Sequence, residues 1–172
     1  MPPERRRRCF IHFVCVPPGR GRFSLDTFLP CFYAFWASLF FAFIFEVKKP
    51  AVLLLSSAVG ALGWAVFLLM APIGSDVARY FLSTVLVTVL SEVLARMMKV
   101  PATVFLLVGI IPLVPGGGLY YAMEYLINGD FDAFVEKGIQ TAAYAGAIAV
   151  GVSMVSSLTR ILTWHYFSRK KH

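Results

Sequence analysis

The stretch VPATVFLLVGIIPLVPGGGLYYAMEYLI, residues 100–127, combines the composition of a membrane span with the strongest helix breakers in the chain. It is long enough to cross a bilayer core of about 30 Å as a helix. Its centre holds two prolines and three consecutive glycines: Pro112, Pro115, Gly116, Gly117 and Gly118. Proline removes a helical hydrogen bond and glycine is a poor helix former, so the stretch predicts a membrane helix that is unwound across residues 112–118.

The position of this break indicates a binding site. The helical parts on either side, residues 101–111 and 119–127, would be about 16 Å and about 14 Å long, so the break is expected near the bilayer midplane. Unwound backbone at that depth must be buried in protein or line a wet cavity. The second half-helix, beginning at about Leu119, would point its N–H groups at the break and favour an anion such as a carboxylate. A kink that serves only packing is the alternative.

Two pairs of polar residues are further candidates. Tyr120 and Glu124 are four apart, and therefore share a face that could offer a hydroxyl and a protonatable carboxylate; a place in the interfacial aromatic belt is the alternative. Glu92 and Arg96 have the same spacing inside an apolar segment. They are interpreted either as an ion or gating pair or as side chains that snorkel to the interface. Arg79 is interpreted as an interfacial anchor.

The whole composition excludes a soluble domain. Of the 172 residues, 59% are hydrophobic and 15% charged, against roughly 25% charged in soluble domains. Apart from residues 1–24, the chain is expected to be one membrane domain, residues 25–172, an all-α bundle of about five transmembrane helices with the fourth broken. The expected spans are residues 27–45, 51–70, 77–97, 100–123 and 138–159.

The net charge of +7 lies mostly in a basic tail, since residues 1–24 hold six arginines and one acid. The Lys and Arg of the remaining body predict a cytoplasmic C-terminus and an external loop at 128–137, and no nucleic-acid partner. The same orientation places Arg5 to Arg8 outside, although the rule expects arginines on the cytoplasmic side. Two interpretations stay open: the tail is authentic, or the start has been assigned too far upstream. A missed sixth element would also resolve the conflict.

Catalytic and metal-binding motifs are not found. The three cysteines and three histidines have no metal-ligand spacing, so neither a metal nor a cofactor is expected. HExxH and GxSxG are not present, which argues against an intramembrane enzyme. Small residues at four-residue spacing predict close helix packing. They are Ala143, Ala147 and Gly151, and Ala61 and Ala65 beside Gly60 and Gly63.

A family resemblance follows from these residues. The run KVPATVFLLVGIIPLVPGGGLYYAM, with SEVLARMM before it and FIFEVKKPAVLLLSSAVGALGW further upstream, resembles the C-terminal half of the threonine/serine exporter (ThrE) family. The resemblance covers about residues 27–165 and is closer to the YjjB-like small subunit of exporters that are split into two proteins.

This resemblance implies a multi-pass subunit in the bacterial inner membrane that exports small carboxylate metabolites, either threonine and serine or a dicarboxylate such as succinate. It also implies a YjjP-like partner that carries the N-terminal half of the exporter, and a homo- or hetero-oligomer in the lipid bilayer. A non-transporting scaffold subunit that stabilises a partner membrane protein is the rival interpretation.

Overall fold

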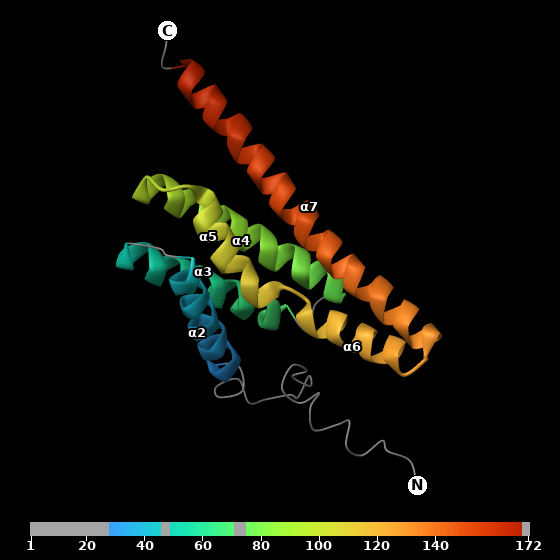
Figure 1. The fold of residues 1–172 in the computed structure, drawn as a ribbon. Helices are drawn as coiled ribbons and strands as arrows, with labels where there is room; N and C mark the ends of the chain where they lie inside the picture. Colours follow the sequence, from blue (N-terminus) through green and yellow to red (C-terminus); the bar gives the residue numbers. More distant parts are fainter. Residues whose placement is uncertain (1–27, 46–48, 71–74, 170–172) are drawn as a thin grey trace.

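The computed structural model describes residues 28–45, 49–70 and 75–169, and all the regular elements in these ranges are helices. In chain order they are α2 (Phe28–Ile44), α3 (Pro50–Leu69), α4 (Asp76–Met98), α5 (Ala102–Ile110), the short 3-10 helix η1 (Ile111–Leu113), α6 (Gly116–Ile127) and α7 (Phe131–Arg169) (Figure 1). The basic tail of residues 1–24, and with it the question of the true start, lies outside the described residues.

The helices have the lengths expected of a membrane protein. Three stretches are long and apolar enough to cross a membrane: Pro50–Leu69, Asp76–Met98 and Phe131–Ile161. The broken pair Ala102–Leu113 and Gly116–Ile127, bent by 50°, is a fourth if it is counted as one span, and the apolar helix Pro30–Ile44 is shorter. The predicted all-α membrane bundle is therefore confirmed, with three or four elements of full span length within the described residues.

The last helix is much longer than the sequence predicted. We expected a helix over residues 138–159, whereas α7 covers 39 residues, about 58 Å. Hydropathy detects only the part of a helix that suits the hydrocarbon core, and α7 continues through polar residues on both sides. Its start is fixed by Asp130, whose Oδ1 accepts the N–H of Ala133 at 3.2 Å, directly after Gly129 turns the chain at φ 77°.

The broken helix lies against the middle of α3 and α4. A Cβ built on Gly109 would meet the side chains of Val59 and Val87, and one built on Gly60 would lie 3.5 Å from Pro112 Cγ. Val59, Val87 and Leu113 form a buried apolar cluster. Since Gly60 and Val87 are near the midpoints of α3 and α4, the break is at mid-depth of these two helices.

Beyond the break the chain leaves this group of helices. Among the described elements α6 packs only on α7, whereas α5 and η1 both pack on α2, α3 and α4. Figure 1 shows α6 running alongside the N-terminal part of α7, away from α2 and α3. The molecule therefore consists of a helical group, α2 to α5, and an α6–α7 hairpin joined to it through the contact of α7 with α4.

Some of the small residues predicted to pack between helices do so, and others are exposed. Gly63 lies directly against the Val87 side chain, and a Cβ on Gly151 would be 3.3 Å from Thr84 Cβ. Ala143, in contrast, is exposed. The four-residue repeat thus marks a packed position at Gly151 and an outward-facing one at Ala143.

Replacing Gly63 by leucine is expected to loosen α3 from α4. Val87 is fully buried and is itself in contact with Gly63 and Gly109, so it cannot move aside, and overpacking of this kind costs about 1–3 kcal/mol. The midpoint of thermal unfolding in detergent should fall. Gly146→Leu is the matched control, because a Cβ there meets nothing within 4 Å. Equal effects of the two substitutions would contradict the packing described here.

Candidate functional site

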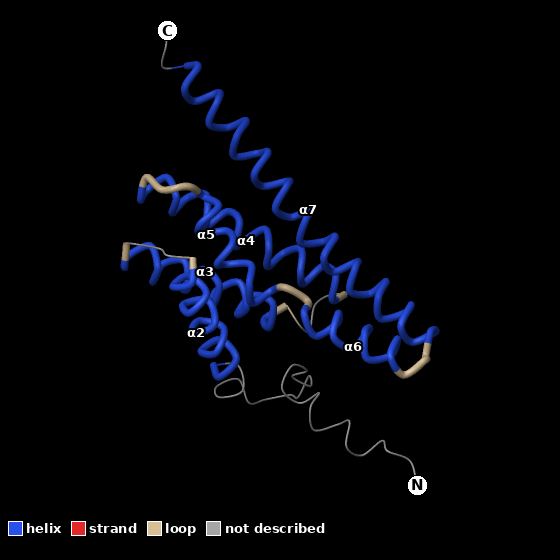
Figure 2. The backbone as a smooth tube through the Cα atoms, in the orientation of Figure 1, coloured by secondary structure: helices blue, strands red, loops and turns tan. Residues whose placement is uncertain are grey.

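The break in the fourth predicted span begins with Pro112. This proline has no N–H, so the carbonyl of Val108 loses its α-helical donor, and the chain tightens into η1, where Val114 N–H donates to Ile111 O at 3.2 Å. Only Val114 and Pro115 lie outside a helix, and Gly116 N–H then donates to Val114 O at 2.7 Å. Figure 2 shows this short non-helical segment between α5 and α6.

The predicted unwinding of the three glycines is wrong. Gly116, Gly117 and Gly118 form the first turn of α6, which therefore begins three residues before the expected start at Leu119. Glycine weakens the interior of a helix, but these glycines lie in a first turn, where the N–H groups have no partner in the helix in any case. Pro115 at the N-cap of α6 keeps Val114 extended, so η1 does not continue into the glycines. The break is consequently shorter than its composition indicated.

The N-terminus of α6 offers free hydrogen-bond donors at the break. Leu119 N–H donates to Pro115 O at 3.3 Å, and the N–H groups of Gly117 and Gly118 have no backbone acceptor among the described residues. Free N–H groups and the positive end of the helix dipole together favour an anion. The direction of α6 thus agrees with the prediction that its N–H groups point towards the break.

The three glycines have different surroundings. A Cβ built on Gly116 or Gly117 would meet nothing within 4 Å, whereas one built on Gly118 would run into the side chain of Thr141 on α7. Gly118 therefore permits the close approach of α6 to α7. Gly116 and Gly117 are exposed, and their lack of side chains leaves the backbone open to a ligand.

Tyr120 and Glu124 share a face of α6, as their spacing predicted, and both are exposed. Tyr120 is 65% exposed and has Tyr121 as its ring neighbour. The face of α6 that meets α7 instead carries Gly118 and the buried Ala122. Within the described residues neither Tyr120 nor Glu124 makes a side-chain hydrogen bond, an ion pair or a ring contact with another candidate residue.

Glu92 and Arg96 form the predicted pair on α4. Arg96 Nη2 lies 3.7 Å from Glu92 Oε2 and donates to the backbone carbonyl of Thr159 on α7 at 3.4 Å. The Arg96 side chain is 51% exposed. The pair therefore connects α4 with α7 far along the chain from the break, and the structure does not bring it together with residues 112–118.

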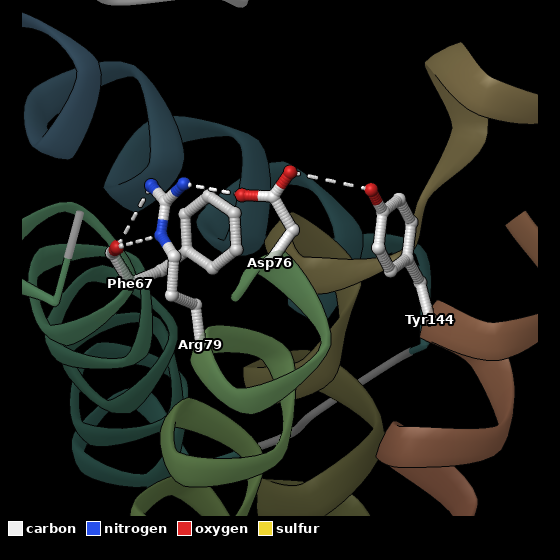
Figure 3. Close-up of polar contacts among 4 residues, drawn as sticks. All are labelled: Phe67, Asp76, Arg79 and Tyr144. Carbon is white, nitrogen blue, oxygen red and sulfur yellow. Dashed lines mark hydrogen bonds and ion pairs between the residues drawn. The ribbon is translucent and has the colours of Figure 1, made fainter. Parts of the chain in front are cut away.

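A cluster of polar and aromatic side chains at the junction of α3, α4 and α7 was not predicted as a unit (Figure 3). Arg79 Nη1 pairs with Asp76 Oδ1 at 2.7 Å, and its Nε and Nη2 donate to the carbonyl of Phe67 at 3.2 and 3.1 Å. Tyr144 of α7 donates to Asp76 Oδ2 at 3.3 Å. Arg79 therefore anchors α4 to the end of α3 through the Phe67 carbonyl, and it pairs with Asp76, which also accepts a hydrogen bond from α7.

Aromatic rings continue this cluster into the bundle. The Arg79 guanidinium lies 4.3 Å from the centroid of the Phe67 ring, and Tyr80 packs on both Phe67 and Tyr144 with centroid distances of 4.7 Å. The three-residue spacing of Asp76 and Arg79 was a readable signal in the sequence. The contact of Tyr144 with Asp76 could not be predicted from the sequence, because it depends on how α7 packs on α4.

Comparison with known proteins gives one match. Residues 30–158 match the family model described as "Threonine/Serine exporter, ThrE". Neither the curated proteins nor the solved structures yielded a match.

Proposed function

The chain belongs to the threonine/serine exporter (ThrE) family of membrane transporters, and from this we propose that it is a membrane subunit of a secondary exporter of small carboxylate metabolites. Threonine and serine are the substrates that the family description names. A dicarboxylate such as succinate is the other candidate, because it offers the same anionic group. The proposed site is the break between η1 and α6.

One observation carries this proposal: the first turn of α6 presents N–H groups that have no backbone acceptor among the described residues, beside two glycines with open space around them. At Gly116 and Gly117 a Cβ would meet nothing within 4 Å, and the break lies level with the middle of α3. A carboxylate there would accept hydrogen bonds from the backbone and gain from the helix dipole. The N–H groups of Gly117 and Gly118 are the proposed donors to the carboxylate, Gly116 leaves the backbone beside them uncovered, and Pro112 and Pro115 set the direction of α6.

Tyr120 and Glu124 are proposed to complete the site only together with another chain. Both lie on the face of α6 that no described element covers, and a carboxylate is costly in lipid unless protein covers it. A partner subunit carrying the N-terminal half of the exporter, YjjP-like, would supply that cover. The proposal includes a bacterial inner-membrane location with the C-terminus in the cytoplasm, which the distribution of Lys and Arg supports.

An export measurement tests the proposed function. The native host is compared with a strain that lacks this chain, after both are loaded with a threonine-containing dipeptide or with succinate. Loss of the chain should raise the intracellular level and lower the extracellular level of threonine, serine or succinate by several-fold. If no small carboxylate differs between the two strains, the chain is not an export subunit, and the scaffold role is the better description.

A further inference from the structure

The buried hydroxyl groups of this bundle fall into two sets. The described residues bury seven of them completely or almost so: Ser38, Ser56, Ser57, Ser83, Thr84, Thr88 and Ser91. Five donate to a carbonyl three or four residues earlier in their own helix, at 2.7 to 3.0 Å. Ser38 and Ser83 do not, and neither hydroxyl has a hydrogen-bond partner among the described residues. The same is true of the buried indole N–H of Trp64.

Ser38 and Trp64 both lie beside the break. A Cβ built on Gly60 would contact the Ser38 hydroxyl on one side and Pro112 Cγ, at 3.5 Å, on another, so Ser38 of α2 approaches the start of η1. Trp64 is one turn further along α3 than Gly60 and packs against the cluster that contains Leu113. Ser38 therefore lies near the first residues of η1, and the Trp64 side chain packs on the apolar cluster to which Leu113 of η1 belongs.

Ser83 reaches the same level from α4. Val87 is in contact with Gly109 of α5, where a built Cβ would lie 2.9 Å from Val87 Cγ1. Val87 also packs with Leu113 of η1 in the buried apolar cluster, and Ser83 lies one helical turn before Val87 on α4. Because Ser83 and Val87 share a face of α4, the third unpaired donor also belongs to the surroundings of η1.

The chemistry of these three groups indicates what they bind. A buried donor without an acceptor costs about 1–3 kcal/mol, and a serine in a helix can avoid that cost by bonding to its own backbone, as Ser57 and Ser91 do. The indole N–H can only donate. An oxygen atom that accepts hydrogen bonds therefore suits all three groups.

We propose that Ser38, Trp64 and Ser83 bind the oxygen that the substrate carries at its side-chain end, while the first turn of α6 binds its carboxylate. This inference rests on the proposed export function and extends it to substrate selection. The substrate class is a short metabolite with an oxygen-bearing group at each end. That group is a hydroxyl in a hydroxy amino acid and a second carboxylate in a dicarboxylate.

Single substitutions in the full-length chain, made in the native host, test this inference. Ser38→Ala and Ser83→Ala remove one unpaired hydroxyl each. Trp64→Phe removes the indole N–H but keeps a ring that can stack on Phe67, whose centroid lies 5.2 Å from that of Trp64. Each should lower export of threonine and serine, or of succinate, by about tenfold. Ser57→Ala and Ser91→Ala are matched controls, since these hydroxyls are equally buried but bonded within their helix; their export should be unchanged.

The outcomes are distinguishable. Loss of threonine and serine export identifies the hydroxyl as the bound group, and loss of succinate export identifies the second carboxylate. Wild-type-like export by the three variants, or an equal loss in the controls, overturns this inference and leaves the proposed function standing. A wild-type chain that exports none of these substrates overturns both. The unfolding midpoint of Ser38→Ala and Ser83→Ala should stay level or rise, because no hydrogen bond is lost; a fall would assign these residues a structural role and overturn the inference.

Discussion

Export is expected to fall at least tenfold in Gly117→Leu while the chain stays folded and assembled. The side chain of the new leucine has room, because a Cβ at Gly117 meets nothing within 4 Å, and leucine is a better helix former than glycine by about 1 kcal/mol. The same side chain would cover the open backbone where the carboxylate is proposed to bind. A tenfold loss corresponds to about 1.4 kcal/mol of binding, which exclusion of a ligand from one turn of N–H groups readily supplies. Export and the unfolding midpoint in detergent are measured together.

Two other glycines serve as references for Gly117→Leu. Gly118→Leu should lower the unfolding midpoint, because its side chain would run into Thr141 and force α6 away from α7. Gly146→Leu should not lower the unfolding midpoint and should leave export unchanged, because Gly146 of α7 is as open as Gly117 and lies outside the break. Normal export by Gly117→Leu, with the complex assembled, would rule out the break as the substrate site and favour a scaffold subunit.

The sequence predicted where the fourth span breaks but not how its backbone continues. Pro112 and Pro115 act locally: each removes a donor and restricts the preceding residue, so their effect can be read without knowing the fold. The effect of glycine depends on its position in a helix. Gly116 to Gly118 were expected to be unwound, yet they start α6, because Pro115 ends the preceding helix and leaves them in a first turn.

Features that depend on which helices meet were beyond the sequence. Gly117 and Gly118 are neighbours of the same type, and only the position of Thr141 on α7 distinguishes the open one from the packed one. Likewise, Ser38 and Ser57 are both serines in apolar helices, and only the structure distinguishes the hydroxyl of Ser57, which donates to Leu53 O, from that of Ser38, which has no partner among the described residues. Local patterns predicted the first four spans within a few residues but not the length of α7, while the candidate ligands needed the tertiary contacts.

The second large effect is expected at Arg79, whose replacement by leucine should destabilise the protein by about 2 kcal/mol. Three donors of this guanidinium are used, two on the carbonyl of Phe67 and one on Asp76. Its side chain is only 17% exposed, so water replaces these bonds incompletely when they are lost. Because Asp76 also accepts from Tyr144, the substitution weakens the hold of α4 on both α3 and α7. The unfolding midpoint and the m-value in a detergent titration report the change.

Arg96 provides the matched comparison that decides whether geometry or mere charge is responsible for the effect at Arg79. Both are arginines of α4 with an acid one turn away, but Arg96 is 51% exposed and lies 3.7 Å from Glu92. Arg96→Leu should therefore cost less than about 1 kcal/mol, as exposed ion pairs do. Arg79→Lys separates the contributions further: it keeps the charge beside Asp76 but not the planar group that donates from two nitrogens to Phe67 O, so most of the loss should remain. Full rescue by lysine, or equal losses at the two arginines, would mean that the bonds to the end of α3 do not stabilise this junction.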